Sequence, residues 1–282
     1  MTGTLVQKAM LVDLRISQIT KTRTDAGASR KTTQDNQAEE KAGKFIKNLF
    51  HPSSMAEINT LIGQVRTTHE SLTRPWGRDG VRILATAAFT EYTTRIRGLI
   101  AQIEKAAQDF ADKYPEALEK AKSAEHLGGL FKADDYPTQE QVRESFNVKI
   151  LFFPIPTAGD FRVEIGAEDV EAIRAEIERE TAETMRNAMK GLYEELYEAI
   201  GDLSMKIYQG GVSKASVEAM LNRIDRASKQ NVAGDAEFDQ TIAELRECFD
   251  VDAKDLREDA MYADQVVDKA DELAVKMSEY FM

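Results

Sequence analysis

The chain has 282 residues, of which 42% are hydrophobic and 30% are charged, so it can form one or two globular domains with a substantial core. No apolar run approaches the roughly 20 residues that a membrane-spanning helix needs, and Asp13 and Arg15 interrupt the apolar stretch near the start, which argues against a signal peptide. Cys248 is the single cysteine, which excludes an intramolecular disulfide and favours the cytoplasm. We expect Cys248 to be a buried residue of a helix.

The formal net charge of −12 is unevenly distributed. Residues 1–100 carry 15 Lys and Arg against 9 Asp and Glu, a net +6, whereas the remainder carries 22 against 40, a net −18. This asymmetry is compatible with a nucleic-acid surface, with attraction between two parts of the chain or between subunits, and with ordinary solvated charge.

The first predicted element is a strand within residues 10–22, where apolar and polar residues alternate. Residues 23–36 are polar and basic and lack large apolar side chains, so we expect a mobile loop there. A helix is then predicted from about residue 37 to residue 50.

Two longer helices follow, and capping or helix-breaking residues mark their ends. Ser54 and Glu57 form a capping box at the start of the first helix, which ends before Pro75. The second is predicted from about Val81, and Pro115 interrupts its apolar stripe.

The hydrophobic period changes from 3.6 to 2 in residues 146–166, just after a short helix that Thr138 and Gln141 open with another capping box. Two alternating runs flank a turn-rich loop, Pro154 to Asp160, which predicts a β-hairpin. A hairpin alone is marginally stable, so we expect residues 10–22 to supply a third strand of a small antiparallel sheet.

The rest of the chain reads as helix. Residues 167–209 predict one helix of about 40 residues, longer than usual in globular proteins and typical of a coiled-coil arm or bundle. Shorter helices are predicted after a Ser213 cap to about residue 230, at 236–249 and at 253–281. The predicted fold is α+β and mainly α, with a basic part at residues 1–166 and an acidic helical part at 167–282 in one continuous structure.

No catalytic motif stands out. The pair Gly43–Lys44 lacks the first glycine and the hydroxyl of a phosphate loop, and residues 250–255 place Lys254 and Asp255 where a calcium loop needs a ligand and a glycine. The three histidines have no second ligand at metal spacing. We therefore predict no catalytic residues, no metal site and no cofactor, and we do not expect an enzyme.

Three segments outside regular helix are dense in unusual residues. One of them, Asp134 to Pro137, is expected to be a helix entry with a packed tyrosine, and the other two are candidates for binding. The first, Arg74 to Arg82, places the single tryptophan among three arginines, which suits phosphate or a partner's carboxylates, or pins a helix corner. With nearby lysines, the candidate nucleic-acid or partner-binding residues are Arg74, Trp76, Arg78, Arg82, Lys41, Lys44 and Lys47. The second is the stiff hairpin tip, whose candidate contact residues are Pro154, Ile155, Pro156, Asp160, Phe161 and Arg162.

The chain resembles an uncharacterised family of bacterial and phage proteins. The resemblance rests on Leu14-x-Ile16, on Arg74-Pro75-Trp76 with Gly80, on Asp135-Tyr136-Pro137 followed by Arg143 and Phe146, and on Pro154-x-Pro156 with Asp160 to Val163. The C-terminal third is similar only as generic helix. The resemblance implies a phage or mobile-element origin and, because some members are encoded near them, a MoxR-like AAA+ ATPase or a von Willebrand A-type protein as partners. It implies no activity and no catalytic residues.

Three functions are compatible with these features. The first is a non-enzymatic phage or prophage assembly or adaptor protein, acting in the bacterial host cytoplasm through self-association or a protein partner. The second is a DNA-binding protein for recombination or DNA protection, which would use the basic N-terminal section. The third is imitation of DNA by the acidic helices. The first is our leading hypothesis, with a homo-oligomer as the expected state.

Overall fold

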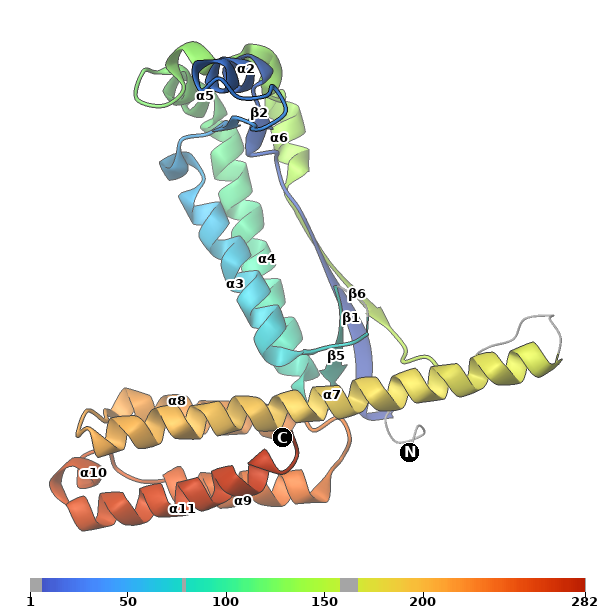
Figure 1. The fold of residues 1–282 in the computed structure, drawn as a ribbon, viewed down its shortest axis with the longest axis vertical. Coiled ribbons are helices and arrows are strands. Elements are labelled where there is room, and N and C mark those ends of the chain that lie inside the picture. The colour runs from blue at the N-terminus through green and yellow to red at the C-terminus, as the bar shows by residue number, and fades with distance from the viewer. Residues whose placement is uncertain (1–6, 78–79, 158–166, 282) are drawn as a thin grey trace. The chain divides into compact units, whose positions relative to one another are not determined.

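A computed structural model describes residues 7–77, 80–157 and 167–281 (Figure 1). It confirms the predicted class, because the chain is mainly helical and carries a small antiparallel sheet. The sheet has four strands in the order β4-β5-β1-β6, and a separate two-stranded sheet pairs β2 with β3. No helix of the described residues is both long enough and apolar enough to cross a bilayer.

The chain divides into two compact units, each discontinuous in sequence. Unit 1 comprises residues 1–13, 70–92 and 151–282, and unit 2 comprises residues 14–69 and 93–150. This division differs from the single boundary that we expected at residue 166. Unit 2 carries 18 Lys and Arg against 15 Asp and Glu, a net +3, and unit 1 carries the other 19 against 34, a net −15.

The four-stranded sheet corrects the prediction of a helix from Val81. Its strands are β1 (Ala9–Ser17), β4 (Arg74–Pro75), β5 (Val81–Ala85) and β6 (Asn147–Phe153). Leu11 pairs with Ile83 and Ala9 with Ala85 in the antiparallel β1–β5 ladder. The β-branched and apolar residues of β5 are used for this pairing, so helix α4 (Phe89–Asp112) begins later than predicted.

The first arm of the predicted hairpin is a strand, β6, as expected. The second arm, with Phe161, and the rest of the turn from residue 158 lie outside the described residues. The predicted strand at 10–22 is β1, which pairs with β5 as well as with β6.

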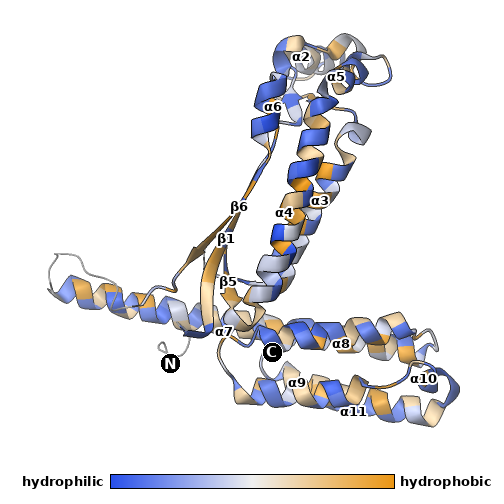
Figure 2. Ribbon diagram, turned by 180° about the vertical axis from the view of Figure 1, so that it is seen from behind, coloured by the Kyte–Doolittle hydropathy of each residue, from blue (hydrophilic) through white to orange (hydrophobic). Residues whose placement is uncertain are grey.

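Unit 1 contains the acidic helices, and its core lies between them. They are α7 (Ala167–Tyr208), α8 (Lys214–Lys229), α9 (Ala236–Phe249), α10 (Asp255–Glu258) and α11 (Ala260–Ser278). Polar and apolar residues alternate along them (Figure 2), and the apolar faces of α7, α8, α9 and α11 pack together. The 42-residue α7 and the Ser213 cap of α8 are confirmed. The predicted 253–281 helix is broken at Asp259, whose side chain instead accepts the Tyr262 N–H at the start of α11.

Unit 2 overturns two predictions near the N-terminus. Its elements are β2 (Thr22–Thr24), α2 (Ala26–Asp35), β3 (Ile46–Asn48), α3 (Ala56–Leu72), most of α4, α5 (Tyr114–Lys122) and α6 (Gln139–Ser145). The expected mobile loop at 23–36 is largely helix α2, which Asp25 caps by accepting the Ala28 N–H at 2.9 Å. The expected helix at 37–50 is a turn followed by β3, because β3 pairs with β2.

Aromatic side chains form the centre of unit 2. Phe50 lies 5.7 Å from Phe110 and 5.5 Å from Tyr136 between ring centroids, both edge to face. The interruption at Pro115 is confirmed, since α4 ends at Asp112 and α5 starts at Tyr114. The Thr138–Gln141 capping box is confirmed as well.

Candidate functional site

The candidate site is a groove in unit 1, lined in part by residues of α7, β1 and β5. Figure 1 shows α7 passing the ends of these two strands. The volume of the groove is about 570 Å³, within the roughly 300–1,000 Å³ typical of ligand sites. Its apolar lining residues are Leu11, Trp76, Val81, Pro156 and Ile177, and its other lining residues are Gly77, Glu180, Thr181, Glu183, Thr184 and Asn187. We call this site the Trp76 groove.

Three segments that are far apart in sequence build the Trp76 groove. Trp76 lies on the turn between β4 and β5, where its N–H donates to the Val81 carbonyl at 3.0 Å. Pro156 follows the buried Ile155, which anchors the end of the β6 segment in the core. Ile177 comes from the first half of α7. The groove therefore unites Trp76 with Pro156, which the sequence placed in two separate candidate segments.

Two of the residues that line the groove are acidic. Glu180 and Glu183 are both exposed residues of α7. Glu183 lies 3.6 Å from Arg179, whereas Glu180 makes no salt bridge to a described residue. Since unit 1 carries a net −15, its field favours a cationic occupant.

The arginines of the candidate segment have internal partners. Arg74 Nη2 contacts Glu195 at 2.5 Å, and Arg74 Nε donates to Gln230 Oε1 at 2.7 Å. Arg82 Nε donates to Thr73 Oγ1 at 2.6 Å, and burial lowers the pKa of Arg82. Arg78 lies outside the described residues. The described guanidinium groups therefore brace the β4–β5 corner rather than present a cationic face.

The three candidate lysines all lie in unit 2. Lys41 and Lys44 are exposed, and neither makes a salt bridge to a described residue. Lys47 is buried, with its side chain 1% exposed. Of the hairpin-tip residues, Pro154 is exposed, Ile155 is buried in the core, and Asp160, Phe161 and Arg162 lie outside the described part of the chain.

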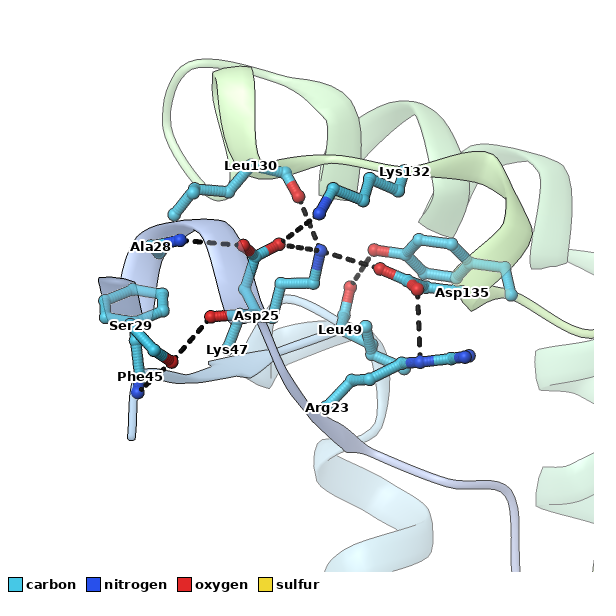
Figure 3. Close-up of polar contacts among 11 residues, drawn as sticks. Arg23, Asp25, Ala28, Ser29, Phe45, Lys47, Leu49, Leu130, Lys132 and Asp135 are labelled. Atoms are coloured by element: carbon cyan, nitrogen blue, oxygen red, sulfur yellow. Dashed lines mark hydrogen bonds and ion pairs between the residues drawn. The ribbon is translucent and has the colours of Figure 1, made fainter. Parts of the chain in front are cut away.

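Lys47 is the centre of a buried ionic cluster in unit 2 (Figure 3). Its Nζ lies 2.6 Å from Asp135 Oδ2 and 3.3 Å from Asp25 Oδ2, and it donates to the Leu130 carbonyl at 2.7 Å. Lys132 contacts Asp25 at 2.7 Å, and Arg23 contacts Asp135 at 3.2 Å. This cluster ties β2, α2 and β3 to the segment that precedes α6.

The same cluster perturbs the titration of Asp25. The ammonium group of Lys132, followed by the Ala28 N–H, holds the pKa of the Asp25 carboxyl well below its usual range. A depressed folded-state pKa contributes stability that is present above the unfolded-state value of about 4 and is lost as the pH falls below it.

As the pH falls from about 4 to about 2, we therefore expect the free energy of unfolding of unit 2 to decrease more steeply in the wild type than in an Asp25→Asn variant. Asparagine can still cap α2, so the variant removes the charge and keeps the cap. Hydrogen exchange of the α2 amides along a pH series, corrected for intrinsic rates, measures both slopes. Equal slopes would contradict this assignment.

The described residues contain no group of three or more His, Cys, Asp or Glu side chains placed to hold a metal ion. Cys248 is buried, as expected, and its desolvation raises the pKa of the thiol. The chain matches no family model, no curated protein and no solved structure at a significant level.

Two parts of the candidate site escaped the sequence analysis. Ile177 and Glu180 were read as parts of a long helical stripe and its solvated face, with no signal that they line a groove. The ionic cluster was also missed, although Asp25 stands where an N-cap of α2 is expected once that helix is known.

Proposed function

We propose that this chain is a non-enzymatic assembly protein that acts by self-association, with the Trp76 groove as its docking site. The observation that carries the proposal is the combination of apolar and acidic lining residues in a groove of about 570 Å³. Apolar lining residues supply affinity when they are buried, and charged lining residues select the partner and orient it.

The charge distribution favours a second copy of the chain as the occupant. Unit 1 carries a net −15 and unit 2 a net +3, so each copy presents both an acidic unit and a basic one. Opposite potentials accelerate the association of such copies and suppress pairing of like surfaces. The AAA+ ATPase or von Willebrand A-type partners that the resemblance implies are the competing occupants.

The nucleic-acid alternative has less support. Lys47 is buried, and Arg74 and Arg82 are held by partners within their own unit, so three of the expected phosphate contacts are used internally. The acidic unit around the Trp76 groove also repels phosphate.

Solution mass tests the proposal. At low ionic strength, light scattering should give a multiple of the 31.6 kDa chain mass, and the mass should fall as salt is raised. Ile177→Asp places a charge in the lining of the groove and should reduce the mass to that of one chain. Tyr208→Asp, at an 83% exposed position of the same helix outside the groove, is the matched control and should keep the wild-type mass.

A strict monomer at all protein concentrations would contradict self-association. If the chain is a monomer and a host AAA+ or von Willebrand A-type protein captures it, that protein rather than a second copy is the occupant of the groove. A monomer that binds double-stranded DNA at about 50 mM salt, where non-specific binding is strong, would support the nucleic-acid alternative instead.

A further inference from the structure

We infer that the occupant of the Trp76 groove is the segment Lys41–Ile46 of a second copy. This inference rests on the proposed self-association and assigns the two surfaces that meet. The segment belongs to unit 2, and its sequence is Lys-Ala-Gly-Lys-Phe-Ile.

The segment Lys41–Ile46 is exposed along its whole length. Phe45 and Ile46 are 37% and 60% exposed. Lys41 and Lys44, which make no salt bridge to a described residue, precede them. An exposed apolar pair beside two exposed lysines suits a partner surface that is apolar and acidic.

The backbone at the Phe45–Ile46 end of this segment is held in place, although its side chains are exposed. The Phe45 N–H donates to Ser29 Oγ at 2.9 Å (Figure 3), and the Phe45 carbonyl accepts from the Asp25 N–H at 2.9 Å. Lys47, the next residue after Ile46, is anchored in the buried ionic cluster. The end of the segment that is fixed in this way loses little conformational entropy when it binds. The ionic cluster thus positions the segment for docking.

The groove and the segment complement each other in charge and in apolar character. Lys41 and Lys44 are three residues apart, and so are Glu180 and Glu183, which therefore lie on neighbouring positions of the α7 surface. Phe45 and Ile46 match the apolar lining residues Trp76 and Ile177. The groove volume of about 570 Å³ is large enough for the two apolar side chains of the segment.

Each copy contributes two different surfaces to this contact. Two copies can exchange segments reciprocally in a closed dimer, several can close into a ring, or the contact can continue as a filament. The stoichiometry follows from the measured mass.

Charge reversal on both sides tests the inference. Lys41→Glu with Lys44→Glu, and separately Glu180→Lys with Glu183→Lys, should each weaken self-association at least tenfold in sedimentation velocity at low salt. The protein that carries all four changes should regain the wild-type mass, since the pairs are restored with inverted sign. Lys31→Glu with Lys122→Glu is the matched control, because it makes the same charge change at two exposed lysines of unit 2 outside the segment.

The outcomes separate this inference from the proposed function. A monomeric wild type would overturn both. If the wild type is oligomeric and the charge reversals leave its mass unchanged, this inference alone is overturned. If Met205→Asp with Tyr208→Asp then abolishes the oligomer, the contact lies on the exposed face of α7 instead. Carbodiimide cross-linking of a mixture of ¹⁵N-labelled and unlabelled chains should join Lys44 to Glu180 or Glu183 in mixed-isotope pairs. Same-isotope pairs alone would place the contact within one chain and overturn the inference.

Discussion

Replacing Lys47 with methionine should destabilise unit 2 by about 3–5 kcal/mol, the cost of removing one partner from a buried ionic pair. Methionine keeps most of the aliphatic stem of lysine and removes its charge. The Lys47 side chain is 1% exposed, and its Nζ contacts Asp25, Asp135 and the Leu130 carbonyl. Its loss leaves Asp135 Oδ2 without its buried cation and the Leu130 carbonyl without its donor. Lys132 still contacts Asp25, so the effect falls mainly on Asp135.

Hydrogen exchange of the α2 amides measures this loss within unit 2 itself. Destabilisation by about 3 kcal/mol accelerates exchange by more than a hundredfold where the amides open through unfolding of the unit. Lys31→Met, at an exposed lysine of α2, is the matched control and should change stability by no more than about 0.5 kcal/mol. Equal exchange rates in the two variants would show that the cluster does not stabilise unit 2.

The same substitution also separates two roles of the cluster. If the cluster positions the segment Lys41–Ile46, Lys47→Met should weaken self-association even though Lys47 itself is too buried to contact a partner. If the α2 amides of this variant exchange faster but its solution mass is that of the wild type, the cluster stabilises unit 2 and does not position the segment.

Long, periodic elements could be predicted from the sequence, and short elements could not. The 42-residue helix α7 has a continuous apolar stripe, and its bounds agree with the prediction within about one residue. By contrast, α2 has few apolar residues and depends on its Asp25 cap, and β3 has three residues whose strand character comes from pairing with β2. Propensity is a weak guide where contacts distant in sequence decide the conformation.

The candidate site could be predicted from the sequence only in part, for the same reason. The sequence singled out Trp76 and Pro156 because a lone tryptophan and paired prolines are conspicuous. It could not place them in one groove, because their positions depend on how β4, β5 and the end of β6 meet α7. Lys47 and Lys44 look equivalent in sequence, yet one is buried and the other exposed. That difference arises from Asp25 and Asp135, which lie 22 and 88 residues away from Lys47 in the chain.

The second large effect is expected in unit 1, where Phe238→Ala should destabilise the helical core by about 3–5 kcal/mol. Phe238 is 0% exposed, and its ring stands edge to face against Tyr193 of α7 at 5.1 Å between centroids. Tyr193 in turn stacks on Tyr280 at 4.3 Å. Truncation to alanine removes the contact between α9 and α7 and leaves a cavity that the packed helices cannot fully close.

Urea unfolding followed by tryptophan fluorescence measures this change. Trp76 is the single tryptophan and belongs to unit 1, where it packs against the core, so its signal reports on that unit. Tyr208→Ala, at an 83% exposed position of α7, removes an aromatic ring of similar size and should cost no more than about 0.5 kcal/mol. Equal transition midpoints for the two variants would contradict the packing described for α9.

Phe238→Ala also links the core of unit 1 to the groove without changing a residue that lines it. Tyr193, Ile177 and Glu180 belong to one helix, so weaker packing of Tyr193 should let the first half of α7 move relative to Trp76. We therefore expect Phe238→Ala to weaken self-association at urea concentrations where the unit is still folded. Unchanged association under those conditions would mean that the groove is held by the β4–β5 corner and its Arg74–Glu195 contact rather than by the helical core.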